Sequence, residues 1–67
     1  MSVRDRIVKV LEEASWPLST KQVAEKAGVS RNTAGKYLAV LEAEGVVHRH
    51  QIGRANLWRL RKKVEDT

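Results

Sequence analysis

The stretch "VAEKAGVSRNTAGKYLAVLEAEGVV", residues 23–47, decides the fold because it encodes two helices joined by a very short turn. Gly28 suits the left-handed position that ends a helix, and Ser30 follows as a good N-cap for the next one. That next helix runs to a second glycine cap at Gly45, as in a Schellman motif. Its apolar residues are spaced four and three apart on one face: Ala34, Leu38 and Leu41. The stretch therefore predicts a helix, a tight turn and a second helix.

The first helix of this pair starts at a capping box, because Ser19 and Gln22 have the spacing at which each side chain bonds the other residue's backbone N–H. We predict this helix over residues 20–27. An earlier helix is predicted over residues 3–14, opened by a similar box at Ser2. Its apolar residues recur at helical intervals: Ile7, Val10, Leu11 and Ala14.

After Gly45 the apolar pattern changes from a helical period to alternation, which is typical of strands. The runs "VVHRHQI" (46–52) and "LWRLR" (57–61) flank "GRAN" (53–56), so we predict two antiparallel strands joined by a glycine-containing loop. Leu18, which follows the helix-stopping Pro17, is expected to form a very short third strand.

The two tryptophans have different predicted places. Trp58 shares a strand face with Leu60, and we expect both to close the core. Trp16 is expected to act as a plug beneath the first loop. Aromatic residues make up 4% of the chain, too few for the stacking surface of a protein that binds single-stranded nucleic acid.

Length and composition exclude several classes of protein. The 67 residues suit one domain, predicted over 1–61, with a polar tail over 62–67. The absence of cysteine excludes disulfides and thiolate metal sites. No signal peptide or apolar span is recognisable, so we expect a cytoplasmic protein with no membrane partner. The fold class is α+β, with three helices, a two-stranded wing and a short strand before the second helix.

The placement of charge points to a polyanionic partner. The formal net charge is +5, and sixteen consecutive residues between Glu25 and Glu42 contain no acid. A further twenty between Glu44 and Glu65 also contain none. These two acid-free stretches cover most of the second helix of the pair and the whole hairpin, so an anionic partner would meet no acidic side chain over them.

Residues 18–60 resemble the winged helix-turn-helix DNA-binding domains of bacterial and archaeal transcriptional regulators. The resemblance rests on residues 23–47 and on "GRANLWRL" (53–60), which looks like a wing tip and a returning strand. It implies a sequence-specific regulator that inserts the third helix into the major groove of double-stranded DNA and places the wing on the backbone or minor groove. The alternative is a winged-helix module for protein–protein interaction in a transcription or replication assembly.

Side-chain geometry assigns roles within the segments that the resemblance selects. Arg31 can fork onto guanine and Asn32 can bridge adenine, so these two are the best candidates for reading bases. Gly35 lacks a side chain where the backbone could approach DNA closely. The predicted base-reading residues are Arg31, Asn32, Thr33 and Gly35. The predicted backbone contacts are Thr20, Lys21, Ser30, Lys36 and Tyr37, and the predicted wing contacts are Arg49 and Arg54.

Other functions find little support in the sequence. No catalytic set or phosphate loop is recognisable, so we predict no enzyme and no cofactor. His48 and His50 share a strand face, but nothing near them in sequence completes a metal shell, so we predict no metal. We expect a monomer in solution, two copies of which can pair weakly on DNA. Val8, off the apolar stripe of the first helix, is the candidate for such a contact.

Overall fold

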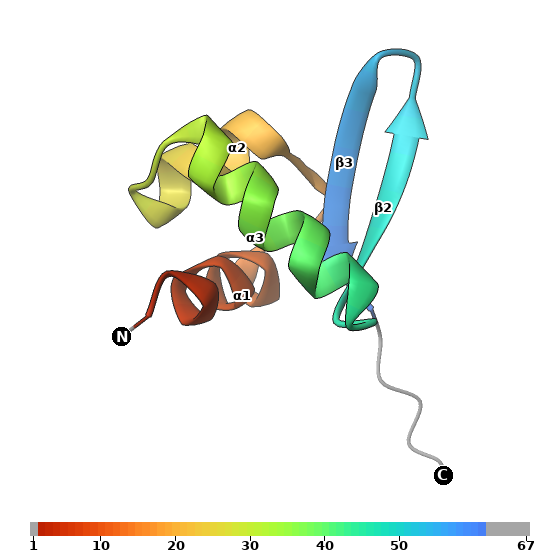
Figure 1. Cartoon of the computed structure of the whole chain (residues 1–67). Coiled ribbons are helices and arrows are strands. Elements are labelled where there is room, and N and C mark those ends of the chain that lie inside the picture. The colour runs from red at the N-terminus through yellow and green to blue at the C-terminus, as the bar shows by residue number, and fades with distance from the viewer. Residues whose placement is uncertain (1, 62–67) are drawn as a thin grey trace, which may run out of the picture.

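The computed structural model describes residues 2–61, which form three helices and a three-stranded antiparallel sheet (Figure 1). The predicted α+β winged-helix fold is confirmed. The helices are α1 (Val3–Glu13), α2 (Thr20–Ala27) and α3 (Arg31–Ala43). The strands are β1 (Leu18–Ser19), β2 (Val47–Ile52) and β3 (Ala55–Leu60). The predicted tail over 62–67 lies outside the described residues.

Local capping chemistry sets the limits of α2. Ser19 Oγ accepts the Gln22 N–H at 3.1 Å, and Gln22 Oε1 accepts the Ser19 N–H at 2.9 Å, so the predicted capping box is complete. Gly28 has φ +73°, a left-handed conformation that favours glycine, and the Val29 N–H reaches back to the Ala24 carbonyl at 3.0 Å. The predicted helix over 20–27 is therefore confirmed at both ends.

The ends of α3 follow the same rules. Ser30 Oγ accepts the Thr33 N–H at 3.1 Å, which satisfies one of the free donors of the first turn. At the other end Gly45 has φ +80°, and the Val46 N–H donates to the Leu41 carbonyl at 2.9 Å. This is the predicted Schellman motif. The first helix, α1, ends one residue before the predicted boundary because Ala14 is extended, with φ −80° and ψ 136°.

The sheet order is β1-β3-β2, and β2 and β3 form the wing that projects beyond the helices (Figure 1). The predicted four-residue loop over 53–56 is wrong, because Ile52 pairs with Ala55 and Gln51 pairs with Asn56. Only Gly53 and Arg54 form the turn. Gly53 has φ +60° and stands at the first turn position, where two-residue hairpin turns of type II′ place glycine.

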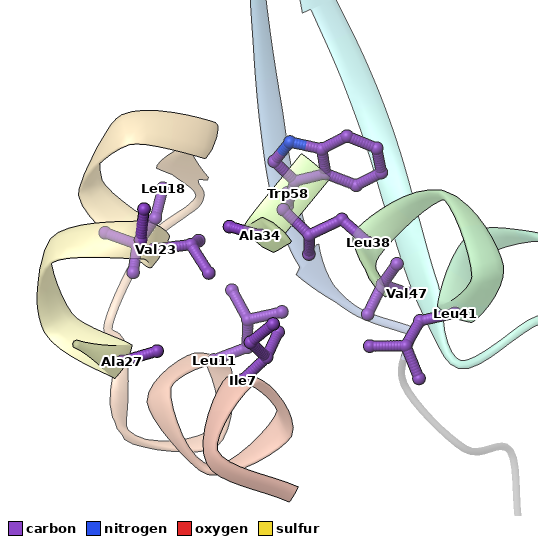
Figure 2. Packing of buried hydrophobic residues seen from close by; sticks show 11 residues of the cluster. Ile7, Leu11, Leu18, Val23, Ala27, Ala34, Leu38, Leu41, Val47 and Trp58 are labelled. Atoms are coloured by element: carbon purple, nitrogen blue, oxygen red, sulfur yellow. The ribbon is translucent and has the colours of Figure 1, made fainter. Parts of the chain in front are cut away.

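The core lies between the three helices and one face of the sheet (Figure 2). Leu38 and Leu41 of α3 have no exposed surface, as the predicted stripe requires. Trp58 of β3 is 5% exposed, and its Nε1–H donates to Thr20 Oγ1 at 2.9 Å. This bond ties the root of the wing to the first turn of α2. The remaining core residues are Ile7, Leu11, Leu18, Val23, Ala24, Ala27, Ala34 and Val47.

Trp16 is the clear departure from the predicted core. Its side chain is 74% exposed, so the expected plug beneath the first loop does not exist. Leu11 and Leu18, the buried residues on either side of it in sequence, already close the core at this end. Within residues 2–61, no helix is both long enough and apolar enough to cross a membrane.

Candidate nucleic-acid interface

Three elements that are separate in sequence surround one concave surface, which we call the basic concavity. Lys21 comes from the first turn of α2, Arg31 from the first turn of α3 and Arg54 from the wing turn. No acidic side chain is among the residues that line it: Ser19, Thr20, Lys21, Arg31, Ile52, Arg54, Ala55 and Asn56. The uniform sign of these charges favours an anion that contacts all three elements at once.

The first half of α3 offers polar side chains to solvent. Arg31, Asn32 and Lys36 are exposed, so all three can reach a partner without rearranging the core. Thr33 is half-buried, and its Oγ1 accepts a hydrogen bond from Ser30 Oγ at 2.9 Å. Ser30 and Thr33 therefore take part in capping the helix. The three exposed side chains, those of Arg31, Asn32 and Lys36, all come from α3, next to the basic concavity.

Thr20 and Tyr37 are half-buried members of the predicted set of backbone contacts. Thr20 Oγ1 already accepts the indole N–H of Trp58, so its own hydroxyl proton remains to be donated. Lys21 beside it is exposed at the N-terminus of α2, where the helix dipole also favours an anion. Tyr37 packs its ring against the core cluster.

Gly35 lies where α3 crosses the start of α2. A Cβ built on Gly35 would meet Thr20 Cγ2 at 3.8 Å, an ordinary van der Waals distance. Gly35 is off the buried stripe, as the sequence indicates, but it is half-buried rather than fully open. An alanine therefore fits without displacing α2.

Arg49 and Arg54, the two predicted wing contacts, have different surroundings. Arg49 lies on β2, and its Nε is 3.4 Å from Glu42 Oε2 of α3, so a carboxylate balances its charge. Arg54 lies at the wing turn and is exposed. The structure brings Arg54, but not Arg49, into the lining of the basic concavity.

The sequence analysis missed Asn56 as a candidate. Its Oδ1 is buried and has no hydrogen-bond partner among the described residues, yet the side chain lines the basic concavity. Buried amide oxygens normally have a hydrogen-bond partner, so the unpaired Oδ1 makes Asn56 an unusual residue of this surface. The signal was hidden because "GRAN" was interpreted as a loop, whereas pairing with Gln51 places Asn56 inside the wing.

His48 and His50 lie on the other face of the wing. They pair across strands with Arg59 and Leu57, and the ring centroids of the two histidines are 4.7 Å apart. Arg59 Nε donates to His50 Nε2 at 3.0 Å. In the part of the chain that the structure describes, no third potential metal ligand joins the two histidines.

The helix pair, the wing and the exposed basic surface together define a winged helix-turn-helix DNA-binding domain of the transcriptional-regulator type. Comparison with known proteins agrees with this class. Residues 1–65 match the model of a family of unknown function, DUF7342, and the chain belongs to that family.

A curated relative is the Dr hemagglutinin AFA-III operon regulatory protein AfaF of Escherichia coli. It is 34% identical over 64 residues, and the match covers 92% of this chain and 75% of AfaF. The relationship to a protein named as an operon regulator supports a regulatory DNA-binding role.

Two solved structures share the fold. The PcaV transcriptional regulator of Streptomyces coelicolor, crystallised with its natural ligand, is similar with a TM-score of 0.82 and 25% identity. The match covers 91% of this chain but only 45% of PcaV. Human N-acetylserotonin methyltransferase in complex with SAM has a TM-score of 0.81 at 18% identity, over 90% of this chain and 18% of the enzyme. At that identity the likeness shows the fold alone.

Proposed function

We propose that this protein is a sequence-specific transcriptional regulator that binds double-stranded DNA, with α3 in the major groove and the wing on the backbone or minor groove. The observation that carries the proposal is the basic concavity, where Lys21, Arg31 and Arg54 converge with no acidic side chain among the lining residues. The named role of AfaF as an operon regulatory protein supports the same function.

The proposed roles follow from side-chain chemistry and from the position of each element. The major groove is wide enough for an α-helix, and Arg31 and Asn32 can each pair bidentately with a base edge. Lys36, one turn further along, supplies a charge to a phosphate, which positions the helix without reading sequence. Arg54 at the wing turn suits a narrow minor groove, whose negative potential attracts arginine.

The N-terminus of α2 completes the proposed contact. Lys21 and the hydroxyl of Thr20 would hold a backbone phosphate, aided by the free N–H groups of the helix start. The side chain of Asn56 lies beside them in the lining of the basic concavity, and its amide N–H groups would donate to a phosphate oxygen. In this role Asn56 links the wing to the DNA backbone.

A salt titration of duplex binding tests the proposal. Affinity should fall linearly with salt on a logarithmic scale, and selection from random duplexes at fixed salt should then enrich one motif. If the selection enriches no motif, the protein is an architectural DNA-binding protein and not a sequence-specific regulator. Absence of duplex binding at about 50 mM salt, where phosphate contacts are strong, would favour the protein–protein interaction module instead.

Arg31→Ala and Lys36→Ala should have different consequences, because one is proposed to read a base and the other to hold a phosphate. Arg31→Ala should cost about 1 to 3 kcal/mol on the selected duplex and relax the preference at one base pair. Lys36→Ala should weaken all duplexes about equally. Competition binding against single-base variants of the selected duplex measures both effects. If Arg31→Ala instead lowers the affinity for every duplex equally, Arg31 contacts the DNA backbone and does not read a base.

Gly35→Ala should stabilise the free protein and weaken DNA binding. Alanine is favoured over glycine inside a helix by about 0.5 to 1 kcal/mol, and the added methyl group meets only Thr20 at 3.8 Å. The same methyl group would hinder close approach of α3 to DNA. Urea unfolding and duplex titration of one preparation measure the two effects. Unchanged affinity would show that the glycine has no role in binding.

A further inference from the structure

A second hollow lies behind the wing, which we call the back groove. Its walls are the C-terminal part of α1, including Val8, and the face of β3 that carries Leu57; Trp16 stands at its edge. None of the predicted DNA contacts lines it. A partner can therefore occupy the back groove while α3 and the wing turn remain free.

The back groove carries exposed apolar surface. Among the described residues, the exposed large hydrophobic side chains are Trp16 at 74%, Ile52 at 63% and Val40 at 47%. Trp16 and Ile52 both line the back groove, whereas Val40 lies on α3 outside it. A protruding indole beside an apolar hollow is typical of the aromatic anchors that dominate protein interfaces.

The charges on the two walls of the back groove are opposite. Glu12 stands on the α1 wall, Arg59 and Arg61 stand on the sheet wall, and all three are exposed. The other acidic residue of the lining, Glu44, is paired with Arg4. In the described part of the chain Glu12 makes no ion pair, and the side-chain hydrogen bond of Arg59 goes to Nε2 of His50 and not to a carboxylate. In a two-fold contact the same pair of residues meets on both sides of the symmetry axis. The acidic wall of each copy can therefore face the basic wall of the other.

We propose that the back groove binds a second copy of this chain, with Trp16 of each copy seated in the groove of the other. The self-complementary charge of the two walls is what favours a second copy over an unrelated partner. A standard interface buries about 800 Å² on each partner, which is about one sixth of the 4880 Å² accessible surface of this chain. An interface anchored by one indole per copy is smaller, so the pairing is weak and appears at high concentration.

Sedimentation equilibrium of the full chain without DNA tests the pairing. The average mass should rise from 7.6 kDa toward twice that value between about 10 µM and about 1 mM protein, the range of weak association. Trp16→Ser should weaken association at least about tenfold, the effect of losing one interface anchor. Val40→Ser, which alters an exposed apolar residue outside the back groove, is the matched control and should change nothing. A monomer at every concentration, or equal loss in both variants, overturns the proposal.

Charge reversal separates a second copy from any other occupant. Glu12→Arg and Arg59→Glu should each lower self-association, because each leaves two like-charged contacts in a symmetric pair. An equal mixture of the two variants should associate at least as well as the unaltered chain, since every contact then joins opposite charges. Failure of the mixture to recover would overturn the two-fold contact. Circular dichroism of each variant confirms folding, and because no DNA is present, failure here leaves the proposed function standing.

Discussion

Trp58→Ala is expected to remove about 3 to 5 kcal/mol of stability, the usual cost of deleting a buried large aromatic side chain. A chain of 67 residues has a total of about 3 to 10 kcal/mol at about 0.05 to 0.15 kcal/mol per residue. The variant should therefore lose from about a third to all of its stability, and its urea midpoint should fall accordingly. The effect is large because Trp58 is 5% exposed and also holds the wing to α2 through Thr20.

The second tryptophan provides a matched control in the same chain. Trp16→Ala removes the same atoms from a side chain that is 74% exposed, so unfolding free energy should change by no more than about 0.5 kcal/mol. Trp58→Phe keeps the aromatic packing but removes the indole N–H, and should cost about 1 kcal/mol for the lost hydrogen bond plus a small packing term. Urea unfolding followed by circular dichroism measures all three. Similar losses for the two alanine variants would contradict the assigned burial.

The parts of the fold that the sequence predicted well depend on neighbours in the chain. The capping box at Ser19 and the left-handed glycines Gly28 and Gly45 are local chemistry, and all three are confirmed. The stripe of Ala34, Leu38 and Leu41 follows from helical spacing alone. These features fix the lengths of α2 and α3, and through them the winged-helix architecture.

The wrong predictions concern residues whose structure depends on contacts with other elements or strands and not on their immediate neighbours in the chain. The wing turn is shorter than predicted because Asn56 pairs with Gln51, and the low strand propensity of alanine and asparagine gives no sign of this. Trp16 was predicted to be a plug from its hydrophobicity, but whether a side chain is buried depends on which residues already fill the core. Spacing along one strand cannot show that Arg49 meets Glu42 of α3.

The sequence predicted which segments of the candidate site carry positive charge, but not how those segments are arranged in space. The acid-free segments indicated which parts of the chain face an anion. They could not show that Lys21, Arg31 and Arg54 line a single concavity, since these residues belong to three elements. The convergence strengthens the proposal because three separate charges would act on one stretch of DNA, and their joint removal is a sharper test than any single substitution.

Removing those three charges together should lower duplex affinity by about a hundredfold to a thousandfold at moderate salt, because each phosphate contact releases counterions. In the variant Lys21→Ala, Arg31→Ala, Arg54→Ala, the slope of log affinity against log salt should fall by about 0.9 for the phosphate contact of Lys21, and by up to about 2.7 if the two arginines also neutralise phosphates from within the grooves. All three side chains are exposed and on the surface, so the fold should persist.

A second triple variant separates the local contact from overall charge. Lys9→Ala, Lys26→Ala and Arg61→Ala also remove three positive charges from a net +5, which leaves +2. Lys9 lies on α1, Lys26 in the last turn of α2 and Arg61 just after β3, and none of the three lines the basic concavity. If binding reflects net charge alone, both variants should lose the same slope. If the basic concavity contacts the DNA directly, the second triple variant should keep almost the whole slope of log affinity against log salt, whereas the slope of the first variant should fall. Fluorescence anisotropy with one duplex at several salt concentrations decides between the two, and equal slopes would remove the basic concavity from the interface.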